Sequence, residues 1–172
     1  MNILGLSAGF HDAAISIIDR EGNILFAGHS ERYSKIKNDP NIHPFLVEDA
    51  VKHGPIDTVA YYEKPFLKQL RQLYSGQGIE WDKLLAKKII QAQLGDVGAR
   101  HYRSYNHHLS HAAAGFQTSP FKRATVVVID AIGEFDTITI WGAEYVNGRA
   151  KYKRLWGQSY PHSIGLFYSA MT

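Results

Sequence analysis

Three histidines in one short stretch have the residue type and the spacing needed to bind a metal ion. The segment NHHLSHAAAGF begins at Asn106 and contains His107, His108 and His111. Asn106 is a favourable N-cap, which predicts a helix beginning at His107. On that helix His107 and His111 lie one turn apart, and His108 and His111 are three residues apart. Either pair can therefore reach a single ion.

An aspartate follows the next predicted strand. The apolar run Thr125–Ile129, TVVVI, predicts a buried strand that ends on Asp130. Carboxylates at strand ends lie at the sheet edge where α/β proteins collect ligands. Two imidazoles and a carboxylate are an ordinary donor set for a divalent cation, so a metal site is predicted here. The alternative is that a histidine only caps the helix and that Asp130 only begins a turn.

The segments that position these residues are predicted to be strands with helices between them. This pattern predicts an α/β fold with a mixed sheet. Its opening segments form an antiparallel meander, and Asn147-Gly148 predicts a later hairpin. The polar segment Ser30–Pro44 is a candidate functional loop. Strands are predicted at Ile3–Ser7, Ala13–Ile18, Ile24–Gly28, Ile56–Tyr62, His101–Tyr105, Thr125–Ile129, Thr137–Val146 and Arg149–Trp156, and further helices at Phe45–His53, Pro65–Tyr74, Ile79–Leu94 and Ser163–Thr172.

Composition excludes several classes of function. The 172 residues carry a formal net charge of +3 without a block of like charges, so no nucleic-acid partner is predicted. The absence of cysteine excludes disulfides and thiolate ligands and agrees with a cytoplasmic location. No apolar run approaches the roughly 20 residues that span a bilayer, so no membrane partner is predicted. The last helix has no stop signal, which predicts a truncated chain.

Five segments in order resemble the carbamoyltransferases of the nodulation and antibiotic type, including those that carbamoylate tobramycin and cephamycin. Each segment is weak alone, but together they are specific and cover essentially the whole chain. They are ILGLSAGFHDAAISII from Ile3, SERYSKIKND from Ser30, NHHLSHAAAGF from Asn106, VVIDAIGEFDT from Val127 and SIGLFYSAMT from Ser163. The resemblance implies an actin-like ATPase (ribonuclease H-like) lobe. Residues 1–172 would be the N-terminal lobe, without the second lobe and the adenylate-forming domain.

The resemblance also implies site residues. His107, His111 and Asp130 would hold a divalent metal, with iron(II) expected, and a fourth ligand would come from the second lobe. His11 would face the carbamoyl donor or acceptor, and Lys37 would contact phosphate or the carbamoyl group. Two further residues, Gly133 and Glu134, would form a turn near the nucleotide.

The activity implied is transfer of a carbamoyl group from carbamoyl phosphate, through carbamoyl-adenylate made with ATP, to a hydroxylated small molecule. The chain alone is expected to be inactive. Two positions depart from the family pattern: Asn38 stands where histidine is usual, and Ala131 where glycine is usual. Neither removes a metal ligand.

Two other functional classes fit the same fold. One is a different enzyme of the actin-like superfold, such as a tRNA threonylcarbamoyl transferase or a sugar kinase. The segment from Ser30 to Asp39 argues against the first, and Ser7, where such kinases use aspartate, argues against the second. The other class is a non-catalytic metal-binding lobe, which would expose the face meant for its partner and form a homodimer.

Overall fold

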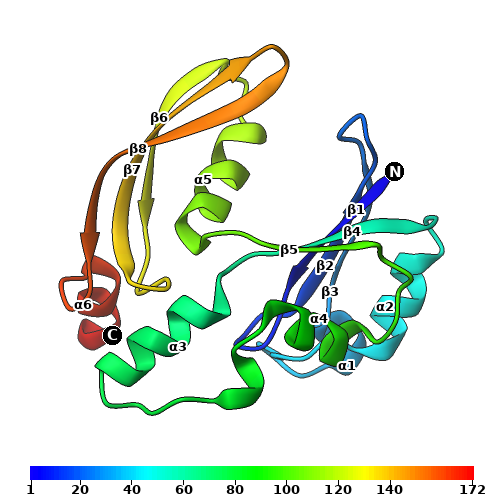
Figure 1. The fold of residues 1–172 in the computed structure, drawn as a ribbon, viewed down its shortest axis with the longest axis horizontal. Coiled ribbons are helices and arrows are strands. Elements are labelled where there is room, and N and C mark those ends of the chain that lie inside the picture. The colour runs from blue at the N-terminus through cyan, green and yellow to red at the C-terminus, as the bar shows by residue number, and fades with distance from the viewer. The chain divides into compact units, whose positions relative to one another are not determined.

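A computed structural model describes residues 1–172, which form two compact units. Unit 1 comprises residues 1–66 and 80–105, and unit 2 comprises residues 67–79 and 106–172. Each unit combines strands with helices (Figure 1), so the predicted α/β class is confirmed. The actin-like assignment stays a prediction. None of the helices is long and apolar enough to cross a membrane.

Unit 1 is built on a five-stranded mixed sheet of order β3-β2-β1-β4-β5. The first three strands pair antiparallel, and β4 and β5 continue the sheet in parallel, so the predicted meander and mixed sheet are confirmed. The strands are β1 (Asn2–Ser7), β2 (Ala14–Ile18), β3 (Ile24–His29), β4 (Ile56–Tyr61) and β5 (His101–Ser104).

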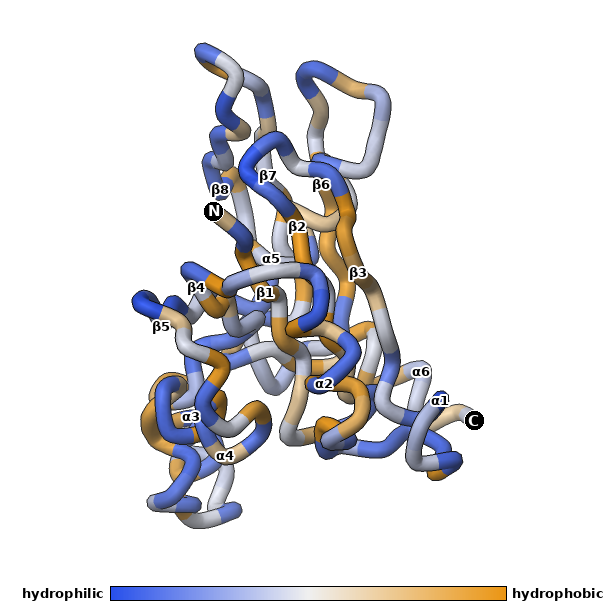
Figure 2. The backbone as a smooth tube through the Cα atoms, turned by 90° about the vertical axis from the view of Figure 1, so that its right-hand side faces the viewer, coloured by the Kyte–Doolittle hydropathy of each residue, from blue (hydrophilic) through white to orange (hydrophobic).

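The core of unit 1 lies on one face of this sheet. Leu4, Ile17 and Val59 are register partners on adjacent strands, and all three are fully buried. Helices α2 (Pro44–Val51) and α4 (Ala86–Leu94) add Leu46 and Ile90 to the same cluster. Figure 2 shows the hydrophobic stretches of β2 and β3 in orange and the more hydrophilic connections in blue.

Two segments between residues 30 and 94 differ from the sequence prediction. The predicted loop Ser30–Pro44 begins with one helical turn, α1 (Glu31–Ser34). The single helix predicted at Ile79–Leu94 is wrong, because a short 3-10 helix at Trp81–Lys83 is separated from α4 by Leu84 and Leu85. Leu85 has extended backbone angles (φ −112°, ψ 121°). Apolar residues recur at helical spacing on both sides of it, so the sequence pattern does not reveal the break. The intervening helix α3 has its predicted bounds, Pro65–Tyr74.

Unit 2 contains a three-stranded antiparallel sheet with one helix packed on it (Figure 1). Its strands are β6 (Arg123–Ile129), β7 (Asp136–Val146) and β8 (Arg149–Ser159). Asn147 (φ 51°) and Gly148 (φ 73°) turn β7 into β8. Both have the positive φ of a type I′ hairpin, as the Asn-Gly pair predicts.

Helix α5 (His107–Gln117) covers one face of the sheet of unit 2. Ala112 is fully buried against Val128 and Trp141, so a small side chain here allows the helix to pack closely on the sheet. Phe116 lies one helical turn further on and contacts the rings of two tyrosines, Tyr145 and Tyr152, at centroid distances of 5.1 and 5.9 Å. This packing fixes the face of α5 that carries no ligands.

Candidate metal centre

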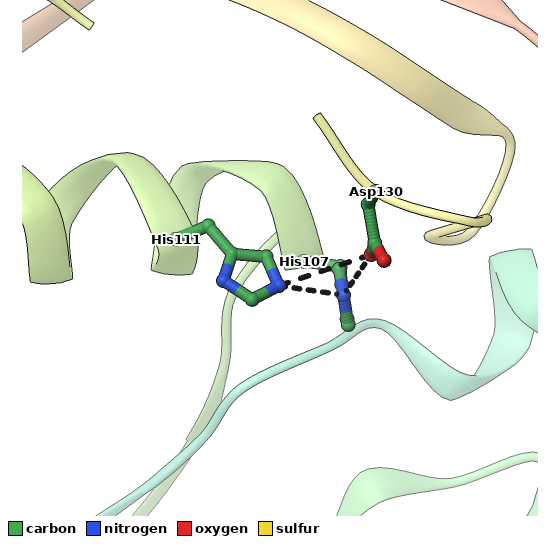
Figure 3. A group of neighbouring side chains, drawn as sticks. All are labelled: His107, His111 and Asp130. Atoms are coloured by element: carbon green, nitrogen blue, oxygen red, sulfur yellow. Dashed lines mark hydrogen bonds and ion pairs between the residues drawn. The ribbon is translucent and has the colours of Figure 1, made fainter. Parts of the chain in front are cut away.

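Helix α5 carries His107 and His111 on one side, one turn apart. Asn106 has an extended backbone and its side chain accepts a hydrogen bond from the Leu109 N–H at 3.1 Å, as an N-cap does. The helix therefore begins at His107, and His111 follows one turn later. Figure 3 shows both rings directed toward Asp130.

Asp130 directly follows the end of β6. Its backbone N–H donates to the Thr137 carbonyl at 2.9 Å, which continues the pairing with β7. One carboxylate oxygen, Oδ1, accepts from the Ala131 N–H at 2.6 Å. This local bond orients the side chain and directs Oδ2 toward the helix.

His107, His111 and Asp130 meet through their donor atoms. His107 Nε2 lies 2.8 Å from Asp130 Oδ2 and 3.0 Å from His111 Nε2. His111 Nε2 is 3.8 Å from the same Oδ2 atom. The side chain of His111 is 54% exposed, against 14% for His107 and 27% for Asp130, so the triad opens on the His111 side.

The electrostatics of the triad suit a cation. The hydrogen bond from His107 is the main cause that lowers the pKa of Asp130 to about 2, so its carboxylate is ionised at neutral pH. Burial, and then the neighbouring His107, lower the pKa of His111. A neutral imidazole is the form that binds metals. Donor atoms all within 4.8 Å of one another can share one divalent ion, so these residues fit such a group.

His108 is excluded from this cluster. Its ring is fully buried, and Nδ1 lies 2.9 Å from Thr139 Oγ1, which also accepts from the Trp141 indole N–H at 2.7 Å. Burial lowers the pKa of His108 and keeps the ring neutral. Of the two histidine pairs that the spacing allowed, the structure therefore brings together His107 and His111.

Gly133 and Glu134 lie in the turn that follows Asp130 in unit 2. The turn is closed by a hydrogen bond from the Gly133 N–H to the Asp136 carbonyl at 2.8 Å. A Cβ atom on Gly133 would lie 2.9 Å from Cδ2 of His108 and 3.3 Å from Cδ2 of His107. Glycine is thus required here by the space that the two histidine rings occupy.

Ser163 and Gly165, which were not predicted as site residues, tie helix α6 (Ile164–Met171) to the turn that begins at Asp130. The Ser163 hydroxyl donates to the Ala131 carbonyl at 2.6 Å and accepts from the Leu166 N–H at 3.0 Å. Gly165 lies against the backbone of Asp130 and Ala131. Two sequence signals pointed to them: a serine preceding an apolar helical run, which is typical of an N-cap, and their place in the family segment SIGLFYSAMT.

Replacing Ser163 by alanine is expected to destabilise the chain by about 1 kcal/mol, since it removes an N-cap that is also bonded to Ala131. Urea unfolding of the chain measures the change. Ser169→Ala is the matched control, because the Ser169 hydroxyl only bonds back to the Gly165 carbonyl in the same helix. We expect the control to stay within about 0.5 kcal/mol of the wild type. Equal midpoints for both variants would show that the cap does not hold α6.

The other two predicted site residues, His11 and Lys37, lie in unit 1. His11 follows β1, and its Nδ1 is 2.8 Å from Asp12 Oδ2. Backbone hydrogen bonds from Gly9 to Pro40 and from Ala13 to Asp39, both 2.8 Å, place the His11 bend beside the segment that carries Lys37. Asn38 has a positive φ of 56°, a conformation that asparagine tolerates well, which accounts for asparagine there.

The fold and the clustered triad together define an α/β protein with a candidate divalent-cation site between a helix and a strand end. Residues 56–172, more than half of the chain, match the family described as Carbamoyltransferase N-terminus. The chain belongs to this family, and the resemblance stated from the five sequence segments is confirmed.

Similar proteins extend well beyond the length of this chain. The Uncharacterized protein sll1178 of Synechocystis is 31% identical and aligns with 99% of the chain but 31% of its own length. The Nodulation protein NolNO of Sinorhizobium fredii is 29% identical, with 92% of the chain and 24% of its own length aligned. The Uncharacterized protein MJ1058 of Methanocaldococcus jannaschii is 23% identical, with 82% and 32% aligned. The chain spans about a third or less of these relatives.

Proposed function

We propose that this chain is the N-terminal part of an O-carbamoyltransferase. The whole protein would move a carbamoyl group from carbamoyl phosphate, through carbamoyl-adenylate, to a hydroxyl group of a small molecule. One observation supports this most: the three predicted ligands His107, His111 and Asp130 meet within the part of the chain that matches the carbamoyltransferase family.

In this proposal the triad holds a divalent cation, with iron(II) the ion that the resemblance implies. His107 and His111 offer ring nitrogens, and Asp130 offers a carboxylate oxygen. A bound cation would supply Lewis-acid polarisation of an oxygen of the donor or the acceptor. The exposed side of His111 leaves room for a further ligand, for which the resemblance implies an aspartate from a second lobe outside this sequence.

The remaining proposed roles are those of His11, which would accept a proton, and Lys37, which would bind an anionic group. In carbamoyl transfer the hydroxyl oxygen attacks the carbamoyl carbon and the adenylate phosphate leaves, so a base and a cationic group are needed. His11 is proposed as the base, because Asp12 beside Nδ1 favours the tautomer whose Nε2 accepts a proton. Lys37 is proposed to bind phosphate or the carbamoyl oxygen, with the nucleotide beside the turn at Gly133 and Glu134.

The test of this function uses the full-length parent protein, loaded with iron(II) and supplied with ATP and carbamoyl phosphate. We expect ATP consumption that depends on a hydroxylated acceptor, measured across a panel of sugars and aminoglycosides. Residues 1–172 under the same conditions are expected to give no turnover. The proposal fails if the parent consumes no ATP with any acceptor, and tight binding of tRNA would favour the threonylcarbamoyl transferase alternative.

A further inference from the structure

Glu134 is a buried carboxylate that accepts hydrogen bonds from the start of α5. Its residue is only 2% exposed. The His107 backbone N–H donates to both carboxylate oxygens, at 3.0 Å to Oε1 and 3.2 Å to Oε2. The Asn106 side-chain amide donates to Oε2 at 3.1 Å. The carboxylate therefore holds the N-cap residue and the first residue of the helix together.

The chemistry of a helix start explains why a carboxylate is placed there. The first N–H groups of a helix have no partner within the helix, and the helix dipole favours a negative charge at this end. The Asn106 side chain accepts from the Leu109 N–H, the third of the helix, and an N-cap side chain reaches the second or third N–H but not the first, which here belongs to His107. Glu134 satisfies that N–H from a turn 27 residues further along the chain.

The turn of residues 130–134 therefore contacts His107 at two points. Asp130 contacts the ring at Nε2, and Glu134 contacts the backbone N–H of the same residue. Gly133 lies between these two contacts and is close to the His107 ring. A residue held at both its backbone and its ring has little freedom to move its donor atom away from Asp130.

We propose that Glu134 is a positioning residue for the metal centre, which sets the backbone of His107 so that its Nε2 meets Asp130 and His111. This inference rests on the proposed metal site. Groups that orient metal ligands typically change metal affinity by about 10- to 100-fold when they are removed. Glu134 would act in this way without touching the ion.

The experiment titrates the metal-free chain of residues 1–172 with Co²⁺ alone, whose visible absorption reports the number and geometry of its ligands. Glu134→Gln keeps one acceptor oxygen but turns an amide N–H₂ toward the Asn106 amide. It is expected to weaken Co²⁺ binding by about tenfold and to alter the spectrum, and Glu134→Ala to weaken binding by up to about 100-fold. Glu144→Gln removes an equal charge from the exposed end of β7 and is expected to bind as the wild type does.

The possible outcomes distinguish a positioning role of Glu134 from a role in fold stability alone. All titrations are made at a temperature at which far-UV circular dichroism shows each metal-free variant to be folded. If both Glu134 variants bind Co²⁺ within twofold of the wild type, with the same spectrum, Glu134 only stabilises the fold and the inference is wrong. If Glu134→Ala does not fold, Glu134→Gln decides alone. If the wild type itself binds no Co²⁺, the proposed metal site fails and the inference fails with it.

Discussion

Replacing Asp130 by alanine is expected to abolish metal binding by this chain. Asp130 supplies the only anionic donor of the triad, and its Oδ2 atom lies 2.8 Å from His107 Nε2 and 3.8 Å from His111 Nε2. Because its pKa is about 2, the charge that attracts a cation is present throughout the neutral pH range. Two imidazole nitrogens without this carboxylate form a much weaker site. The loss should exceed the roughly 100-fold typical of removing a group that only orients a ligand.

His107→Ala is expected to have an effect of similar size, since His107 contacts both other members of the triad. Each variant is loaded with iron(II) under anaerobic conditions and passed through a gel-filtration column, and the metal that remains bound to the protein is then measured. His101→Ala is the matched control, because His101 is an exposed histidine of β5 in the other unit. If both Asp130→Ala and His107→Ala retain metal, the metal site is wrong, and these residues only cap the helix and begin the turn.

Gly165→Ala is expected to destabilise the chain by about 3 kcal/mol, at the upper end of the cost of overpacking. A Cβ atom at this position would lie 2.5 Å from the Ala131 nitrogen and from the Asp130 carbonyl oxygen, and 2.6 Å from the Ala131 Cα atom. All three are backbone atoms, so none can rotate away as a flexible side chain would. Helix α6 must therefore move away from the turn, which also breaks the hydrogen bond from Ser163 to Ala131.

The matched control is a second glycine in the same unit, for which the expected change in stability has the opposite sign. A Cβ atom on Gly115 in α5 would meet nothing within 4 Å, and its φ is not positive. Gly115→Ala should therefore stabilise the chain by about 0.5 to 1 kcal/mol, because alanine loses less conformational entropy in a helix. Urea unfolding in the presence of a chelator compares the two variants. A midpoint for Gly165→Ala at or above that of the wild type would contradict the close packing of α6.

The Gly165 prediction also links stability to the proposed metal site. The backbone that Gly165 contacts is that of Asp130 itself, and Ala131 donates the hydrogen bond that orients the Asp130 carboxylate. Displacement of this backbone should therefore lower metal affinity as well as stability. The Co²⁺ titration on the folded variant measures this second effect.

Local patterns in the sequence determined most of the elements and the types of residue at the site. Short apolar runs joined by a glycine-containing turn predicted the meander of β1 to β3. Asn147-Gly148 predicted the hairpin of β7 and β8, because both residues accept positive φ. Asn106 predicted the start of α5, and the four-residue spacing placed His107 and His111 on one side of it. Each of these signals acts within a few residues of its own position.

Only the tertiary structure decided which groups meet across the chain. By spacing alone His107 and His108 are equally good partners for His111; the family resemblance implied His107, and in the structure the buried contact of His108 with Thr139 on β7 keeps His108 out of the cluster. The bonds from His107 and Asn106 to Glu134, and the contact of Gly165 with Asp130, join segments more than 25 residues apart. Such contacts depend on how the strands pair and on how closely the helices pack on them. No periodic pattern along the chain records that information.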